Sequence, residues 1–225
     1  MRRHLVWQLP LLAVVVFSGP AVKKVVPNDP LFKFQFSFNN PGGKLTIPTY
    51  SYKPAAKDYE AVKGIDPDLL HAWAVTTGKK DVVVAVLDDG FFYNHEDIRD
   101  NIWKNPGESG RDKDGYPKET NGIDDKIWGS NYGEKNVDIA AIGMNYTSFL
   151  KNNCSVYALQ GGTSNSTPVV AGVAALVLSV RPELKAPELK RILMDSVTPL
   201  PALKGKIGSG GMVNAYQALQ LALKR

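Results

Sequence analysis

The sequence predicts an α/β fold with a mainly parallel sheet, and three features of its 225 residues support that prediction. Residues 81–87 (DVVVAVL) form a continuous β-branched run, which is typical of a parallel strand buried on both faces. Residues 169–178 are apolar on all sides of a helix, which indicates a buried central helix. Two amphipathic helices are expected after it, one starting at Pro187 and one capped by Asn214.

The composition excludes several classes of protein. With 44% hydrophobic and 22% charged residues, the chain is close to globular averages, so it is not disordered, collagen-like or a coiled coil throughout. The net charge of +5 is not concentrated in any basic block, so the sequence predicts no binding of nucleic acid. The single cysteine, Cys154, cannot form an intrachain disulfide and is expected to be a small buried hydrophobe.

Residues 1–21 are predicted to be a signal peptide. Arg2 and Arg3 precede an apolar stretch at residues 5–17, and small residues follow it. A membrane-spanning helix needs about 20 apolar residues, so no stable membrane span is expected here. The alternatives are a buried N-terminal strand or an uncleaved interfacial anchor. The sequence therefore predicts a secreted or extracytoplasmic protein.

Residues 22–78 are expected to form an N-terminal segment before the main domain at residues 79–225. Its phenylalanines at positions 32, 34, 36 and 38 alternate with other residues, which is compatible with one half-buried strand. Residues 66–68 are expected to open a short helix, which residues 76–78 close. The apolar face of that helix would consist of Leu69, Leu70, Trp73 and Ala74.

In the main domain, the predicted strand 81–87 leads directly into Asp88. Polar side chains at the carboxyl end of such a strand lie where α/β sheets build their sites. A second short strand is predicted at residues 137–142, and Pro168 is expected in the first turn of the central helix. The closing helices would bury Leu189, Ile192, Leu193 and Val197 in the first, and Tyr216, Leu219 and Leu223 in the second.

Ser164 is a candidate nucleophile. It follows two glycines and directly precedes the central helix, whose free N–H groups and positive dipole end favour developing negative charge. A serine in that place is reactive only when a base removes its proton. The structural alternative is a simple helix N-cap.

The residues around Ser164 resemble a known motif. Residues 162–172 (GTSNSTPVVAG) are similar to the nucleophile motif of the subtilisin-like serine proteases, the subtilases, which is usually GTSMATPHVAG. Asn165, Ser166 and Val169 replace the usual Met, Ala and His, and the other eight positions agree. The resemblance implies a secreted endopeptidase with an Asp/His/Ser triad, built as a three-layer sandwich.

Other segments extend the resemblance to nearly the whole chain from residue 27. Residues 84–90 (VAVLDDG) look like the strand that ends in the family's catalytic aspartate, which Asp88 would match. Residues 137–143 (VDIAAIG) resemble the VDIAAPG strand, and residues 210–215 (GGMVNA) resemble the closing GGxVNA segment.

The triad histidine and the segment with the oxyanion asparagine have no counterpart. No histidine lies between residues 96 and 164, and the join falls near residues 126–129. Residues 79–225 are therefore expected to be an incomplete subtilase catalytic domain, truncated in its centre. A serine without a base stays protonated, so the lone chain should be inactive or nearly so.

Three hypotheses remain open at this point. The chain is a serine endopeptidase that acts on polypeptides, a catalytically dead pseudoprotease used for binding or structure, or a deletion product that does not fold alone. The third hypothesis predicts self-association through an uncovered core, because exposed strand edges invite pairing.

An acidic loop is a candidate calcium site. Alternating carboxylates in a Gly-rich loop are the ligands that Ca²⁺ prefers, and many subtilases bind calcium. The alternative is a solvated polar loop. The candidate ligands are Asp112, Asp114, Asp124 and Asp125.

Overall fold

The computed structural model describes residues 23–49, 55–86, 95–102, 132–151 and 154–224. Within these residues the α-helices are α1 (Leu69–Val75), α2 (Thr163–Val180), α3 (Ala186–Asp195) and α4 (Ala215–Lys224). The short 3₁₀ helices are Phe32–Phe34, Arg99–Asn101 and Pro201–Leu203.

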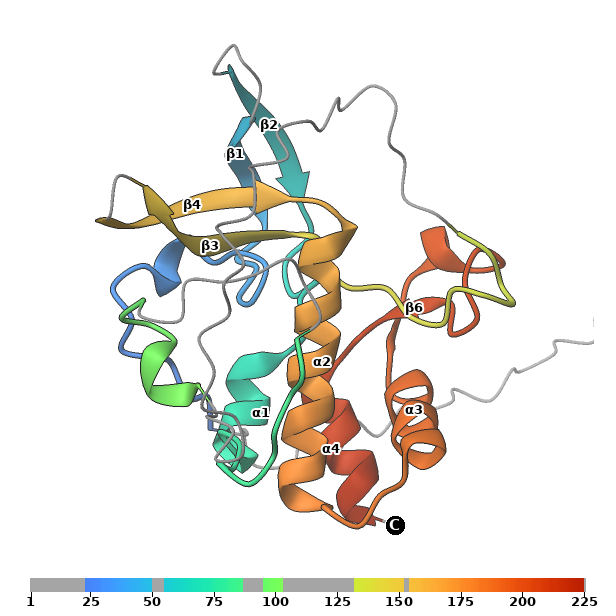
Figure 1. Cartoon of the computed structure of the whole chain (residues 1–225). Helices are drawn as coiled ribbons and strands as arrows, with labels where there is room; N and C mark the ends of the chain where they lie inside the picture. The colour runs from blue at the N-terminus through green and yellow to red at the C-terminus, as the bar shows by residue number, and fades with distance from the viewer. Residues whose placement is uncertain (1–22, 50–54, 87–94, 103–131, 152–153, 225) are drawn as a thin grey trace, which may run out of the picture.

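The described strands form three separate antiparallel pairs. These are β1 (Gly43–Thr49) with β2 (Ala55–Ala61), β3 (Met144–Lys151) with β4 (Cys154–Gly161), and β5 (Thr198–Pro199) with β6 (Gly211–Met212). Figure 1 shows the hairpins β1–β2 and β3–β4 at the end of the molecule where α2 begins, and the other helices around the remainder of α2. Helices and sheets are both present, so the chain is α/β at this level.

The core lies among the helices. Val177 of α2, Ile192 of α3 and Leu219 of α4 are each 0% exposed and belong to one apolar cluster, which Ala72 of α1 joins. Burying a side chain such as Leu or Ile contributes roughly 1.5–3 kcal/mol. This cluster is therefore the main source of stability in the described part of the chain.

The central helix is confirmed, with two corrections. It begins at Thr163, so Pro168 lies in its second turn and not in its first. Because proline has no N–H, the carbonyl of Ser164 lacks its usual helical partner. Only one face of α2 is buried, since Val173 is 1% exposed whereas Pro168 and Gly172 are not buried.

By length and composition alone, α2 also qualifies as a membrane-spanning helix. Central helices of globular domains meet the same criterion, and α2 packs against α3 and α4 through the apolar cluster. In the structure 28% of that span is buried.

The two closing helices are confirmed. Helix α3 begins at Ala186, one residue before Pro187, and Asn214 caps α4 by accepting a hydrogen bond from the Gln217 N–H at 2.8 Å. The predicted face of α4 is wrong at its end, because Leu223 is 53% exposed. In the same turn Ala222 is 0% exposed, so Leu223 lies on the solvent side of the helix.

In the N-terminal segment the short helix is confirmed, and the phenylalanine strand is wrong. Helix α1 begins at Leu69 as expected, although Ala74 is exposed. Residues 32–34 form a 3₁₀ helix, and the Phe38 N–H bonds the Gln35 carbonyl, so the backbone closes local turns. Phe32 is buried against Trp73, with ring centroids 6.1 Å apart.

The predicted strand at residues 81–87 is wrong over its described part. Residues 81–86 belong to no strand, and Val83, Val84 and Val86 are 53%, 46% and 70% exposed. A strand exists only when its backbone groups pair with a neighbour, and no described strand pairs with this run. The expected parallel sheet is accordingly not formed by the described residues.

The second predicted strand, residues 137–142, is replaced by a looser ladder. Ala140 makes an isolated parallel bridge with Met212, and the Val213 N–H donates to the Ala140 carbonyl at 2.8 Å. The Gly208 N–H donates to the Val137 carbonyl at 2.8 Å. The segment is therefore fixed along the closing segment before it enters β3.

Candidate active site

Ser164 lies in the first turn of α2, at the amino end of the helix as the sequence predicts, and it is exposed. Strand β4 ends at Gly161, so only Gly162 separates the strand from the helix. No side chain caps the helix start; the Asn165 N–H donates to the Gly162 carbonyl at 3.0 Å, which leaves the N–H groups of Thr163 and Ser164 as donors without an intrahelical partner. The hydroxyl is thus presented to solvent beside free donors.

Two glycines make this turn possible. Gly162 has a φ of 138°, in the region that only glycine adopts without strain. Its N–H donates to the carbonyl of Gly143 at 2.8 Å. A Cβ at Gly143 would lie 2.7 Å from the Gly162 carbonyl oxygen, so any other residue would force the two segments apart. Sequence reasoning gave Gly143 no role, although it ends a family-like segment.

No described histidine provides a base for Ser164. His71 Nδ1 lies 2.5 Å from Asp68 Oδ1, and His71 packs on Tyr216 of α4. His95 is buried with its ring edge-on to Tyr157 of β4. Neither described ring hydrogen-bonds Ser164, and the proposed partner Asp88 lies outside the described residues.

The segment that follows Asp88 is docked on the strand that leads to Ser164. Besides the His95–Tyr157 ring contact, the Tyr157 hydroxyl donates to Glu96 Oε1 at 3.0 Å. Partial burial, then the bond to Glu96 and the nearby Asp97 carboxylate, raise the pKa of Tyr157 well above its usual value. The phenol therefore stays protonated and keeps this bond at neutral pH.

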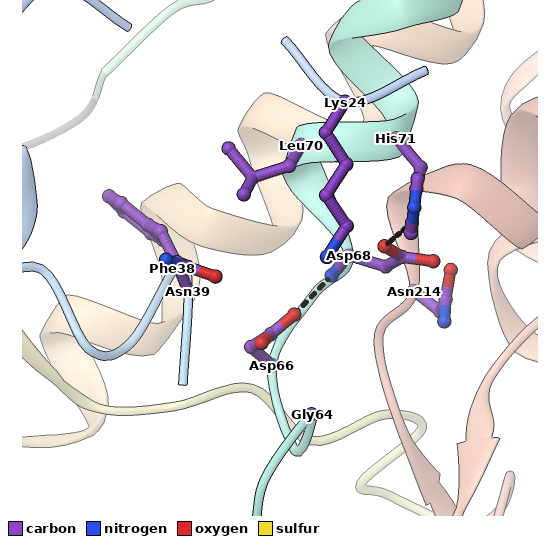
Figure 2. A pocket seen from close by; sticks show the side chains of 9 residues that line it. All are labelled: Lys24, Phe38, Asn39, Gly64, Asp66, Asp68, Leu70, His71 and Asn214. Atoms are coloured by element: carbon purple, nitrogen blue, oxygen red, sulfur yellow. Dashed lines mark hydrogen bonds and ion pairs between the residues drawn. The ribbon is translucent and has the colours of Figure 1, made fainter. Parts of the chain in front are cut away.

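A hollow of about 200 Å³ lies elsewhere, where α1 meets the N-cap of α4 (Figure 2). Asp66 Oδ1 accepts a hydrogen bond from the Asp68 N–H at 2.9 Å, and Asp68 in turn contacts His71. Asp68 adopts a φ of 55°, which is uncommon for a non-glycine residue. None of the lining residues belongs to α2, so this hollow is not part of the Ser164 site.

The candidate calcium ligands Asp112, Asp114, Asp124 and Asp125 all lie outside the described residues. Within the described ranges, no group of three or more His, Cys, Asp or Glu side chains is arranged to hold a metal ion. Calcium binding by the loop stays a prediction.

Ser164 is exposed in the first turn of α2, two residues after Gly162 and close to Gly143, which is a position where a serine nucleophile could be presented. Residues 127–210, which include Ser164 and Gly143, match the model of the subtilase family, Peptidase_S8. Over this segment the chain is similar to the subtilase family. Asp88 precedes the matched segment, so its role rests on resemblance alone.

Two curated relatives are also similar to part of this chain. The chain is 39% identical over 99 residues to a subtilase cytotoxin chain of Escherichia coli, covering 44% of this chain and 28% of that protein. It is 36% identical over 93 residues to subtilisin-like protease 1 of Plasmodium falciparum (isolate 3D7), covering 41% and 13%. The chain thus spans less than a third of the length of either relative.

Among solved structures, one that describes the assembly of the subtilase cytotoxin SubAB matches at 38% identity. The match covers 43% of this chain and 29% of that chain, with a TM-score of 0.37.

Proposed function

We propose that Ser164 occupies the nucleophile position of a subtilisin-like serine endopeptidase, and that this lone chain does not hydrolyse peptide bonds at a measurable rate. The observation that carries the proposal is the exposed Ser164 at the uncapped start of α2, inside the subtilase segment. No described histidine contacts its hydroxyl. Without a proton acceptor the hydroxyl remains a poor nucleophile.

The proposed site also includes Asp88 as the triad aspartate. The docking of residues 95–97 on β4 supports this assignment, because it brings the segment after Asp88 beside the strand that precedes Ser164. The β-branched composition of residues 81–87 supports a three-layer sandwich with a mainly parallel sheet that is truncated in its centre, which leaves the valines at 83, 84 and 86 exposed. In such a sandwich, these side chains would be covered by neighbouring strands.

Labelling with a fluorophosphonate tests the proposal. The serine-directed reagent should leave Ser164 unmodified in the full chain, while an intact subtilase in a parallel sample is labelled completely. Stoichiometric labelling that disappears in Ser164→Ala would contradict the proposed inactivity and would require a proton acceptor outside the described residues.

A catalytically dead pseudoprotease, acting as a binding or structural module, is the second candidate. The well-packed cluster of α1, α2, α3 and α4 favours it, because such a core supports a stable fold without catalysis. The exposed valines favour instead an incomplete domain that self-associates. Light scattering with a thermal melt separates the two: a monomer with a cooperative transition supports the pseudoprotease, and a large scattering species supports the incomplete domain.

Export and calcium binding complete the proposal. The basic start and short apolar stretch within residues 1–21 support export by a cleaved leader. N-terminal sequencing of exported protein should begin after residue 21. The acidic loop supports a calcium site, so Ca²⁺ but not Mg²⁺ should raise the thermal midpoint, and Asp112→Asn with Asp114→Asn should abolish the rise.

A further inference from the structure

The start of α2 is held on both sides of Ser164 by bonds to one short segment, residues 141–145. On the N-terminal side, the Gly162 N–H donates to the Gly143 carbonyl at 2.8 Å. On the C-terminal side, the Ser166 hydroxyl donates to the Ala141 carbonyl at 3.2 Å. Ser164 is therefore bracketed by two anchor points that share a single partner segment.

Asn145 adds a third anchor. Its side-chain Nδ2 donates to the Asn165 carbonyl at 3.1 Å and approaches the Ile142 carbonyl at 3.5 Å. Asn165 is the residue that follows Ser164, so this bond acts directly next to the candidate nucleophile. Because the bond joins β3 to α2 across 20 residues of sequence, it fixes the helix start against the hairpin.

Packing alone does not account for an asparagine at position 145. The residue is only 6% exposed, and its Oδ1 has no hydrogen-bond partner among the described residues. A buried acceptor without a partner loses its hydration with no compensation, so an apolar side chain would serve a purely structural position better. The unpaired Oδ1 makes this amide costly in folding free energy. Its shorter hydrogen bond, at 3.1 Å, goes to the carbonyl of the residue next to Ser164.

Ser166, like Asn145, has a polar side chain that bonds at the start of α2. The subtilase motif has alanine at this position, which has no hydroxyl to donate. The serine Oγ lies so close to Gly143 that a Cβ there would approach it to 2.8 Å. The contact therefore uses the space that the absent side chain of Gly143 leaves open.

We propose that Asn145 and Ser166 are positioning residues, which hold Ser164 in place as a nucleophile that an added base can activate. This inference rests on the proposed role of Ser164. Both residues fix the first turn of α2 on residues 141–145, so the Ser164 hydroxyl keeps its place relative to the free N–H groups of the helix start. An external imidazole then restores reactivity by accepting the hydroxyl proton.

Labelling by a fluorophosphonate forms two bonds, Oγ–P and an N–H on imidazole, and breaks two, O–H and P–F. Imidazole removes the proton from Ser164 Oγ as the Oγ–P bond forms, and fluoride leaves with the electron pair of the P–F bond. The product is a phosphonylated Ser164, which mass spectrometry detects on its peptide.

The experiment measures the imidazole-dependent rate of Ser164 labelling in the full chain. The parent should be labelled only when imidazole is added, and Ser164→Ala should not be labelled at all. Asn145→Ala should lower the imidazole-dependent rate between about 10- and 100-fold, because small displacements of a reacting group have effects of that size. Ser166→Ala should lower it several-fold, and Ser166→Thr, which keeps the hydroxyl, should restore it.

Ser196→Ala is the matched control. Ser196 is 6% exposed, and its hydroxyl donates to the Leu193 carbonyl at 3.3 Å in α3, so the change removes a comparable buried bond away from Ser164. It should shift the unfolding midpoint without changing the labelling rate.

The outcomes separate this inference from the proposed function. If the parent is labelled with imidazole but Asn145→Ala and Ser166→Ala react at the parent's rate, the positioning roles are overturned and the nucleophile stands. If Asn145→Ala does not fold, the Ser166→Ala and Ser166→Thr pair decides alone. If the parent is never labelled at any imidazole concentration, the nucleophile assignment itself fails, and this inference fails with it.

Discussion

Helix α2 and residues 82–86 have similar compositions but differ in secondary structure and in how much of them is buried. Both are rich in valine and alanine, yet Val177 of the helix is 0% exposed and Val86 of the other run is 70% exposed. A helix satisfies its backbone groups within its own segment, whereas a strand depends on a neighbour for every bond. The helix therefore forms once one of its apolar faces is buried. Residues 82–86 can form a strand only if a neighbouring strand pairs with them.

The comparison is tested most strongly by one substitution made in both places. Val177→Ala removes buried methyl groups from the core, and it should lower the free energy of unfolding by about 2–3 kcal/mol. Val84→Ala removes the same groups from a side chain that is 46% exposed, so its effect should stay within about 0.5 kcal/mol. Urea denaturation measures both, and equal losses would show that residues 82–86 are buried in solution.

A smaller effect is expected where α4 begins. Asn214→Ala removes the side-chain oxygen that accepts from the Gln217 N–H, so it should cost about 1 kcal/mol. Asn214→Ser keeps an N-capping oxygen and should recover most of that loss. The urea midpoint reports both, and an unchanged midpoint for Asn214→Ala would argue against the cap as a stabilising contact.

Charged substitutions in the exposed run at residues 82–86 should reduce self-association. They should change the free energy of unfolding little. Val84→Lys with Val86→Lys places charge on the unpaired segment, which should reduce the scattering mass. Leu223→Lys changes an apolar side chain that is 53% exposed on α4, and it should leave the mass as it was. The proposed self-association surface would be wrong if the Leu223 variant, and not the valine pair, dispersed the protein.

The smallest effect concerns pH. The folded-state pKa of Tyr157 is raised, so the stabilisation from its neutral phenol is fully present below the ordinary tyrosine pKa of about 10. That stabilisation is lost as the pH rises above this value toward the folded-state pKa. Absorbance titration should show one phenol ionising later than the others, and Tyr157→Phe should remove that late step. Ionisation of all tyrosines together would contradict the contact with Glu96.

The sequence alone predicted the position of Ser164 and the approximate positions of the α-helices. Ser164 at the start of α2, α3 beginning near Pro187 and the cap at Asn214 all depend on residues within a few positions of each other. Local hydrogen bonds and the conformational freedom of Gly162 are enough to fix such features, because they need no distant partner.

Only the tertiary structure decided the features that depend on partners far apart in sequence. The β-branched run at 82–86 has strand composition but no strand, because the described residues offer it no neighbour. Phe32 is buried because it meets Trp73, not because its segment is a strand. The Asn145 side chain donates to the Asn165 carbonyl across 20 residues of sequence, a contact that no sequence periodicity predicts. Helix caps and turns depend on residues that are neighbours in sequence. Strand pairing and burial depend on contacts with segments that are distant in sequence.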